Sequence, residues 1–168
     1  TAISLGNPVD GPRKYGSIGT ANPPHRVKIV DDAGMEVPSG EVGEIAIGGP
    51  SVMKGYFRDP AATAAVMRDG WIMSGDLARM DEEGYVFIVG RKKEIIIRGG
   101  ENVSPLEVEQ VISRHPAVGE AAAIGIPDRI LGEAVGACVV RCAEVSESEL
   151  IAFCATRLAS FKVPQEIV

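Results

Sequence analysis

The sequence is poor in the residues that build metal centres and disulfide frameworks. Its 168 residues include only 2 His and 3 Cys. His25 and His115 have no Cys or carboxylate partner at metal-ligand spacing, so we expect no metal site. The thiols are odd in number and lack Cys-x-x-Cys spacing. Because they lie in apolar segments, we interpret Cys138, Cys142 and Cys154 as buried free thiols of a reducing compartment, the cytoplasm.

Long apolar runs and excess positive charge are also missing. No run approaches the ~18 apolar residues that a membrane-spanning helix needs. The chain has 17 Lys and Arg against 23 Asp and Glu, a formal net charge of -6. Such a chain has no general attraction for polyanions, so binding to nucleic acid is disfavoured. A hydrophobic content of 45% suffices for a packed core in one domain or two small ones.

The first ninety residues have the pattern of a β-rich unit. A Gly- and Pro-rich segment to about residue 24 is predicted to be loop. Residues 26–30 and 42–47 are predicted to form two antiparallel strands, and residues 71–76 and 84–89 two more. Between these pairs, Asp59 is the predicted N-cap of a helix that starts at Pro60 and ends near Met67.

The stretch from Gly90 to Pro105 joins this unit to a different pattern. A charged cluster at residues 91–94 precedes Ile95-Ile96-Ile97, which we interpret as a strand buried on both faces, because no polar residue alternates with the isoleucines. The pair Gly99-Gly100 permits positive φ or close approach by another group. Ser104-Pro105 then predicts a helix start, with Glu107 three residues after the Ser cap.

The remaining residues alternate helices with short apolar strands. Residues 106–115 have helical spacing, and residues 121–126 and 134–140 are predicted strands. Residues 146–158 are predicted to form an amphipathic helix that opens with a Ser146–Glu149 capping box, and a last strand starts near the end of the chain. This β-α-β-β-α-β order predicts a compact α+β module.

The order of these motifs resembles the adenylate-forming (AMP-binding) superfamily, specifically its acyl-CoA synthetase branch. The chain would be the last third or so of such an enzyme, and the resemblance covers essentially all of it. The residues that carry it are Trp71, Ser74-Gly75-Asp76, Gly84-Tyr85, Gly90-Arg91-Lys92-Lys93-Glu94, Gly99-Gly100-Glu101-Asn102, Pro105 and Glu107-Val108-Glu109.

The resemblance implies both a fold and an activity. Residues 1–91 would form the last β-rich subdomain of a large N-terminal domain, and residues 92–168 a small mobile α+β lid domain. The implied reaction is ATP-dependent conversion of a carboxylic acid to an acyl-adenylate and pyrophosphate, followed by thioester formation with coenzyme A (CoA). Mg²⁺ would bind mainly through the ATP phosphates.

The resemblance assigns nucleotide contacts to Asp76 and Arg91. The Asp76 carboxylate would accept hydrogen bonds from ribose hydroxyls. The alternative interpretation is that Asp76 is an ordinary aspartate of a turn. The planar Arg91 guanidinium would contact ribose and phosphate oxygens. The alternative for Arg91 is a surface salt bridge with an acid of residues 81–83.

Further roles are implied beyond this pair. Lys93 corresponds to the family's hinge position, against the alternative of a solvated surface charge. Gly99 and Gly100 would let the backbone lie against the pantetheine arm of CoA, or would serve only as a turn. Phe161 and Lys162 lie where some ligases hold the CoA nucleotide, although a Phe in this context also suits the core.

Two family elements are expected outside the chain. The phosphate loop belongs far upstream and the catalytic Lys shortly after Val168, so we interpret the chain as a piece of a larger enzyme that alone forms no adenylate. Two alternatives are an adenylating domain that loads a carrier-protein phosphopantetheine and a non-catalytic interaction module. The glycine pair favours CoA over a carrier protein, and the presence of Asp76, Arg91 and Lys93 argues against the non-catalytic module.

Overall fold

The computed structural model describes residues 4–168 and contains two compact units. The first ends at Lys92 and the second runs from Lys93 to Val168. Each unit has its own hydrophobic core. The sequence predicted units of residues 1–91 and 92–168 with strand-rich α+β character, and the α+β fold is confirmed. No helix within residues 4–168 is both long and apolar enough to cross a membrane.

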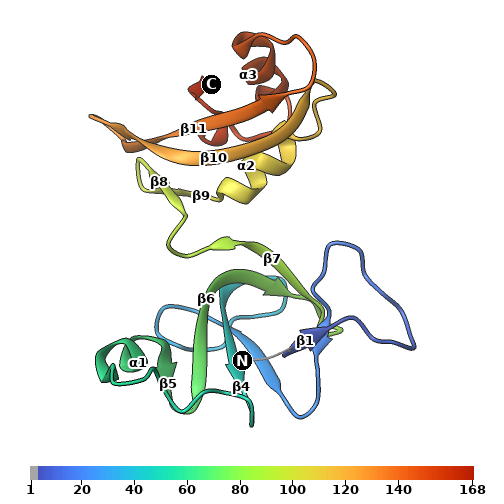
Figure 1. Cartoon of the computed structure of the whole chain (residues 1–168), viewed down its shortest axis with the longest axis vertical. Helices are drawn as coiled ribbons and strands as arrows, with labels where there is room; N and C mark the ends of the chain where they lie inside the picture. The colour runs from blue at the N-terminus through green and yellow to red at the C-terminus, as the bar shows by residue number, and fades with distance from the viewer. Residues whose placement is uncertain (1–3) are drawn as a thin grey trace. The chain divides into compact units, whose positions relative to one another are not determined.

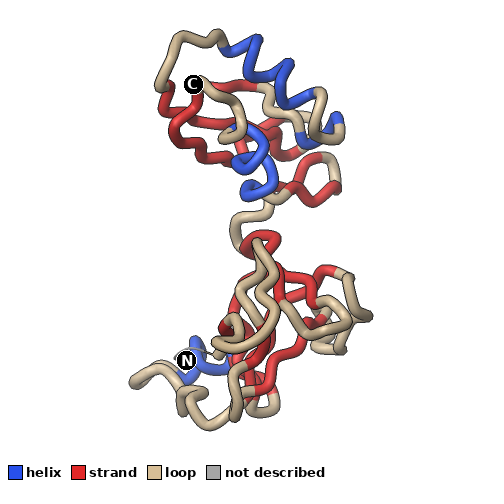
Figure 2. The backbone as a smooth tube through the Cα atoms, turned by 90° about the vertical axis from the view of Figure 1, so that its right-hand side faces the viewer, coloured by secondary structure: helices blue, strands red, loops and turns tan. Residues whose placement is uncertain are grey.

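Unit 1 is built on one antiparallel sheet (Figures 1 and 2), with strand order β3-β4-β6-β5 and β7 beside β6. A small separate sheet pairs β1 with β2. The Asp59 carboxylate accepts the Ala62 N–H at 2.8 Å and caps α1, as predicted. The elements are β1 (Leu5–Gly6), β2 (Thr20–Ala21), β3 (Arg26–Val30), β4 (Val42–Gly48), α1 (Pro60–Val66), β5 (Met67–Arg68), β6 (Trp71–Met80) and β7 (Val86–Arg91).

Apolar residues cover both faces of this sheet. Because side chains alternate along a strand, Ile29 and Ile45 pack on one face while Val30 and Ala46 pack on the other. The central strand β4 is therefore apolar on both sides over most of its length, and a charged side chain within it requires a specific partner.

The motif residue Trp71 fits onto this sheet because a glycine lies beside it. Trp71, Gly48 and Arg26 are aligned across β6, β4 and β3. A Cβ atom on Gly48 would lie 3.1 Å from the indole ring. The ring thus extends across β4, where the Arg26 guanidinium and the Lys28 ammonium lie 5.0 and 4.5 Å from its centroid.

Unit 2 is a five-stranded sheet with strand order β10-β11-β8-β9 and β12 parallel to β11. Residues of α2 and α3 share a single core with the sheet, so both helices cover the same face. The elements are β8 (Ile96–Arg98), β9 (Glu101–Val103), α2 (Pro105–Ile112), β10 (Val118–Asp128), β11 (Gly132–Arg141), α3 (Glu147–Ala155), the 3₁₀ helix η1 (Ser160–Lys162) and β12 (Glu166–Ile167).

The capping predictions in unit 2 are confirmed. Ser104 caps α2 through the Glu107 N–H. Ser146 and Glu149 form the reciprocal capping box of α3. The helix itself is shorter than predicted and ends at Ala155.

The prediction of a strand buried on both faces at Ile95–Ile97 is wrong. Ile96 is 2% exposed and belongs to the core, whereas Ile97 is 55% exposed. The strand β8 is one arm of a hairpin with β9, which the sequence analysis did not predict. Since α2 and α3 cover one face of the sheet, successive residues of β8 alternate between core and surface.

The interpretation of all three cysteines as buried is also wrong. All three are free thiols, but only Cys154 is buried, while Cys138 and Cys142 are exposed. Cys154 lies on the inner side of α3 and is completely covered. Burial raises the pKa of the Cys154 thiol above its ordinary value, with a smaller opposing effect of Arg157.

We expect alkylation to distinguish these thiols. The thiolate is the reacting species, and burial disfavours it and blocks access. In folded protein at pH 8, iodoacetamide should modify Cys138 and Cys142 at least about tenfold faster than Cys154, as measured by peptide mass spectrometry. Denatured protein is the control, in which the three rates should converge. Equal rates in folded protein would contradict the burial of Cys154.

Candidate functional site

The motif Ser74-Gly75-Asp76 forms a bulge in β6. Ala46 of β4 pairs with Met73 of β6, and Glu44 pairs with Leu77, so three residues of β6 lie opposite a single residue of β4. Gly75 has φ +78°, a conformation that favours glycine. A bulge bends a strand and redirects its side chains, and this one sets the direction of the Asp76 carboxylate.

Three backbone groups of this bulge have defined partners. The Gly75 N–H donates to Glu44 Oε1 at 2.9 Å, and the Asp76 N–H donates to Ser74 Oγ at 3.0 Å. The Gly75 C=O accepts the Lys92 N–H at 2.9 Å. The Ser74 hydroxyl therefore has a structural role.

Asp76 and Arg91 face each other across β6 and β7. They are register partners, and Arg91 Nε lies 2.8 Å from Asp76 Oδ1. Their side chains are 32% and 61% exposed, and an ion pair at such exposure contributes about 0–1 kcal/mol to stability. A carboxylate has two oxygens, so accepting Nε leaves capacity for further donors. The pair thus offers hydrogen-bond acceptors and donors at one place, which suits a vicinal diol such as ribose.

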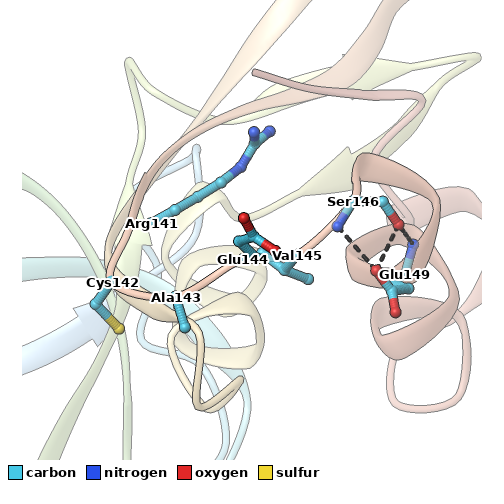
Figure 3. Close-up of a pocket in the computed structure, with 7 residues that line it drawn as sticks. All are labelled: Arg141, Cys142, Ala143, Glu144, Val145, Ser146 and Glu149. Atoms are coloured by element: carbon cyan, nitrogen blue, oxygen red, sulfur yellow. Dashed lines mark hydrogen bonds between the residues drawn. The ribbon is translucent and has the colours of Figure 1, made fainter.

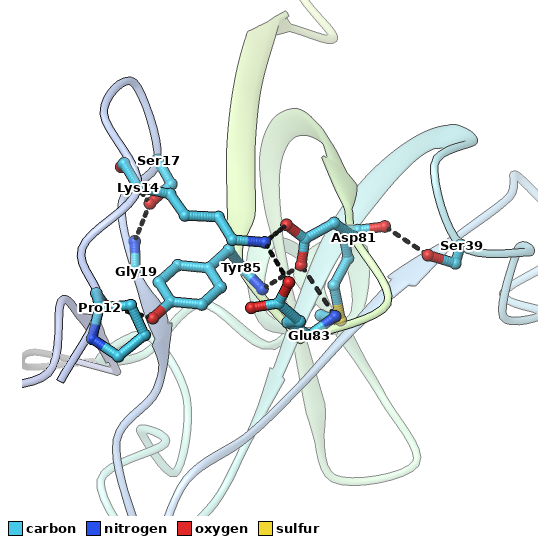
Figure 4. A network of polar contacts seen from close by, with 9 residues as sticks. Pro12, Lys14, Ser17, Gly19, Ser39, Asp81, Glu83 and Tyr85 are labelled. Carbon is cyan, nitrogen blue, oxygen red and sulfur yellow. Dashed lines mark hydrogen bonds and ion pairs between the residues drawn. The ribbon is translucent and has the colours of Figure 1, made fainter.

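Asp81 and Glu83, two of the acids that follow β6, pair with Lys14. Lys14 Nζ lies 2.5 Å from Asp81 Oδ2 and 3.0 Å from Glu83 Oε1 (Figure 4). The hydrogen bond from Lys14 holds the pKa of Asp81 below its ordinary value. Asp81 also accepts the Tyr85 N–H, and the Tyr85 hydroxyl donates to the Pro12 C=O. The Gly84-Tyr85 motif therefore anchors the N-terminal loop of unit 1.

Lys92 and Lys93 have opposite environments although they are consecutive. Lys92 Nζ contacts Asp32 Oδ1 at 2.6 Å and Glu44 Oε2 at 3.2 Å. These hydrogen bonds, first that to Asp32, raise the pKa of Lys92 above its ordinary value. Lys93 is exposed and is the first residue of unit 2. The end of unit 1 is thus fixed at Lys92, directly before the residue that the sequence predicted as a hinge.

Glu44 is a residue of this site that the sequence did not predict. Its side chain is only 12% exposed, within a strand that is otherwise largely apolar. The available signal was one acid between Gly43 and Ile45 in a predicted central strand. That signal identifies an unusual residue but not its partners, which lie 31 and 48 positions further along the chain.

Gly99 and Gly100 form the two-residue turn of the β8–β9 hairpin. Arg98 pairs with Glu101 on either side of the turn, and the glycines have φ +60° and +88°. Two positive φ values characterise the type I′ hairpin turn. A Cβ atom on Gly99 would lie 3.1 Å from Leu131, but one on Gly100 would have no heavy atom within 4 Å. The turn thus explains both glycines, and Gly100 presents bare backbone to open space.

Phe161 and Lys162 lie together on η1. Phe161 is partly buried and packs against the unit 2 core. Lys162 Nζ contacts both carboxylate oxygens of Glu107, at 2.8 and 2.7 Å, in the first turn of α2. These two residues therefore have structural partners within unit 2.

Other parts of the described chain hold no further predicted site residue. An open depression lies at the start of α3 (Figure 3), and none of the residues discussed above as ATP or CoA ligands lines it. Its lining consists of Arg141, Cys142, Ala143, Glu144, Val145, Ser146 and Glu149. Within residues 4–168 no three His, Cys, Asp or Glu side chains cluster as metal ligands would.

Known proteins share this chain's sequence at high identity. A long-chain-fatty-acid–CoA ligase of Escherichia coli is 45% identical over 95% of the chain and 28% of its own length. A sulfoacetate–CoA ligase of Cupriavidus necator is 43% identical over 98% of the chain and 33% of its length. A feruloyl-CoA synthase of Amycolatopsis is 47% identical over 92% and 32%. The chain thus spans about a third of the length of these relatives.

Solved structures agree with these sequence matches. ATP-bound MatB from Rhodopseudomonas palustris matches with a TM-score of 0.94 and 41% identity, over 98% of this chain and 34% of that one. O-succinylbenzoate CoA synthetase (MenE) from Bacillus subtilis, in complex with ATP and magnesium ion, matches with a TM-score of 0.84 and 40% identity, over 92% and 32%.

The family matches divide along the chain as its two units do. Residues 1–57 match the AMP-binding enzyme family, and residues 107–168 match the AMP-binding enzyme C-terminal domain. The motif residues described above lie between or within these segments. With matches to both domains and acyl-CoA ligases as its homologues, the chain belongs to the AMP-binding enzyme family.

Proposed function

We propose that this chain is part of an ATP-dependent acyl-CoA synthetase, which activates a carboxylic acid as acyl-AMP and transfers the acyl group to CoA. The observation that carries the proposal is the Asp76–Arg91 pair, joined at 2.8 Å at the β6 bulge. In such an enzyme, residues up to about 91 would be the last β-rich subdomain of the large domain. Residues from about 92 would be its mobile lid.

In the first half-reaction, unit 1 binds the nucleotide. Asp76 accepts hydrogen bonds from the ribose hydroxyls, and the Arg91 guanidinium donates to ribose or phosphate oxygens. Mg²⁺ arrives on the ATP phosphates, which suits a chain whose described residues offer no cluster of metal ligands. The ATP-bound and ATP–magnesium-bound relatives support both co-substrates.

In the second half-reaction, unit 2 contributes to CoA binding after rotation at Lys93. The bare backbone at Gly100 is suited to a narrow pantetheine arm, because no side chain there would obstruct it. Phe161 and Lys162 would contact the CoA nucleotide. An ammonium has three N–H donors, so a phosphate contact by Lys162 is compatible with its ion pair to Glu107.

The names of the relatives help to separate the reaction steps that this segment would serve from the choice of the acyl group. Ligases named for a long-chain fatty acid, for sulfoacetate and for ferulate share 43–47% identity with the chain. Because acids so unlike one another accompany the same segment, we infer that the segment serves the steps common to them, nucleotide binding and thioester formation. Choice of the acyl group belongs to another part of the enzyme.

The direct test supplies the full-length enzyme with ATP, Mg²⁺ and a panel of carboxylic acids, with and without CoA. Mass spectrometry should detect acyl-AMP without CoA and acyl-CoA with it. If acyl-AMP accumulates and CoA does not consume it, the acyl group must go to another acceptor, such as a carrier-protein phosphopantetheine. If no acid of the panel yields acyl-AMP or acyl-CoA, the proposal is contradicted.

A substitution at Gly100 should separate the turn from CoA binding. Asn tolerates positive φ, so Gly100→Asn should retain the hairpin while placing a side chain where CoA would pass. We expect the rate of thioester formation to fall about tenfold or more, with acyl-AMP formation nearly unchanged, in single-turnover assays of each half-reaction.

Gly84→Asn is the matched control for this substitution. Gly84 has φ +82° and, like Gly100, would have no heavy atom within 4 Å of an added Cβ, but it lies in the β6–β7 turn. It should leave both half-reactions unchanged. An equal effect of the two substitutions would refute the close approach of CoA to Gly100.

Lys93→Pro should impair thioester formation more than adenylation. Proline fixes φ near −65° and so restricts rotation at the hinge, whereas Lys93→Ala removes the charge but retains backbone freedom. We expect the CoA half-reaction to slow about tenfold or more in the Pro variant and to change little in the Ala variant. Equal loss of both half-reactions would refute the hinge role.

A further inference from the structure

We propose that Glu44 is a positioning residue of the nucleotide site, whose one carboxylate holds the Gly75 backbone beside Asp76 and the Lys92 side chain beside Arg91. The inference rests on the proposed function, because it takes Asp76 and Arg91 as the ribose-binding pair. It adds a residue that touches neither nucleotide nor substrate and acts through the two residues that do.

The two oxygens of Glu44 have separate tasks. Oε1 accepts the Gly75 N–H at 2.9 Å, and Oε2 accepts from Lys92 Nζ at 3.2 Å. Gly75 directly precedes Asp76, and Lys92 directly follows Arg91. A single side chain of β4 therefore contacts the chain neighbour of each member of the pair.

A third contact closes this arrangement into a ring. The Lys92 N–H donates to the Gly75 C=O at 2.9 Å. Glu44, Gly75 and Lys92 are thus joined pairwise, with Asp76 and Arg91 paired beside them. A displacement of Gly75 or of Lys92 would strain two of these contacts at once, so the ring limits how far Asp76 and Arg91 can separate.

Burial shields the Glu44 contact with Lys92 from solvent more than the Asp32 contact. Asp32 is nearer, at 2.6 Å, but its side chain is 91% exposed, whereas that of Glu44 is 12% exposed. Water and salt screen an exposed pair far more than a buried one. A buried carboxylate in an apolar strand is costly unless its partners are in place. The contacts with Gly75 and Lys92 therefore account for a carboxylate at residue 44.

The bulge explains why an acceptor is required at this place. The extra residues of β6 remove the Gly75 N–H from the ladder with β4, and a part-buried N–H without a partner is destabilising. Glu44 replaces the lost ladder bond. Without it, the segment that presents Asp76 would have an unsatisfied donor and more than one available conformation.

The experiment uses the full-length enzyme with Glu44→Ala, Glu44→Gln and the matched control Glu41→Gln. Glu41 is exposed and lies three residues earlier. Glu44→Gln retains an acceptor for Gly75 but loses the charge opposite Lys92. The readouts are ATP binding by calorimetry, KM for ATP and for CoA, and hydrogen exchange of the Gly75 amide.

Glu44→Ala should weaken ATP binding and raise KM for ATP on the order of tenfold, with little change in KM for CoA. Exchange at Gly75 should accelerate by a similar or larger factor. Glu44→Gln should have smaller effects of the same kind. Lys92→Met combined with Glu44→Gln should cost less than the sum of the two single effects, because both substitutions remove the ion pair between Glu44 and Lys92.

Different results would overturn the two proposals separately. Wild-type ATP affinity together with wild-type exchange at Gly75 in Glu44→Ala would refute the positioning role of Glu44, as would equal losses for ATP and CoA. Exchange and ATP binding need no acyl substrate, so they test Glu44 even if the panel of acids yields no product. Failure of the wild-type enzyme to bind ATP would refute the nucleotide site and the positioning role together.

Discussion

The hydrogen bond from the Gly75 N–H to the Glu44 carboxylate is the contact at the centre of the β6 bulge, beside the Asp76–Arg91 pair. A bulge redirects Asp76 toward Arg91, but it also removes backbone groups from the ladder. Such groups require new partners when they are buried. Glu44, Ser74 and Lys92 supply them. The same local arrangement therefore brings Asp76 beside Arg91 and provides hydrogen-bond partners for the backbone groups of the bulge.

The same arrangement defines where unit 1 ends. Lys92 is held through its backbone by Gly75 and through its side chain by Glu44 and Asp32, while Lys93 is exposed. The hinge that we propose at Lys93 would absorb the backbone rotation directly after a residue that the fold holds in place. Unit 2 then presents a hairpin turn whose two glycines satisfy a type I′ geometry and leave bare backbone at Gly100. One pair of residues thus serves both the fold and the proposed contact with CoA.

Much of the local structure could be predicted from the sequence. The caps Asp59, Ser104 and Ser146 act on N–H groups three residues away, so their chemistry is visible in short segments. The order of motifs also identified the family, and its matches to both domains confirm that identification. The exposure of Ile97 and Cys138 was not predictable in this way, because apolar composition does not show that α2 and α3 cover only one face of the unit 2 sheet.

The sequence by itself determined the helix caps and the positive-φ pair Gly99-Gly100, because each depends on neighbouring residues. Only the tertiary structure decided the partners of charged groups. Arg91 pairs with Asp76 and leaves Asp81 and Glu83 to Lys14. Glu44 reaches Gly75 and Lys92 across 31 and 48 positions. These pairings follow from strand register and from the bulge in β6, and register is set by the packing of whole strands, which no short segment specifies.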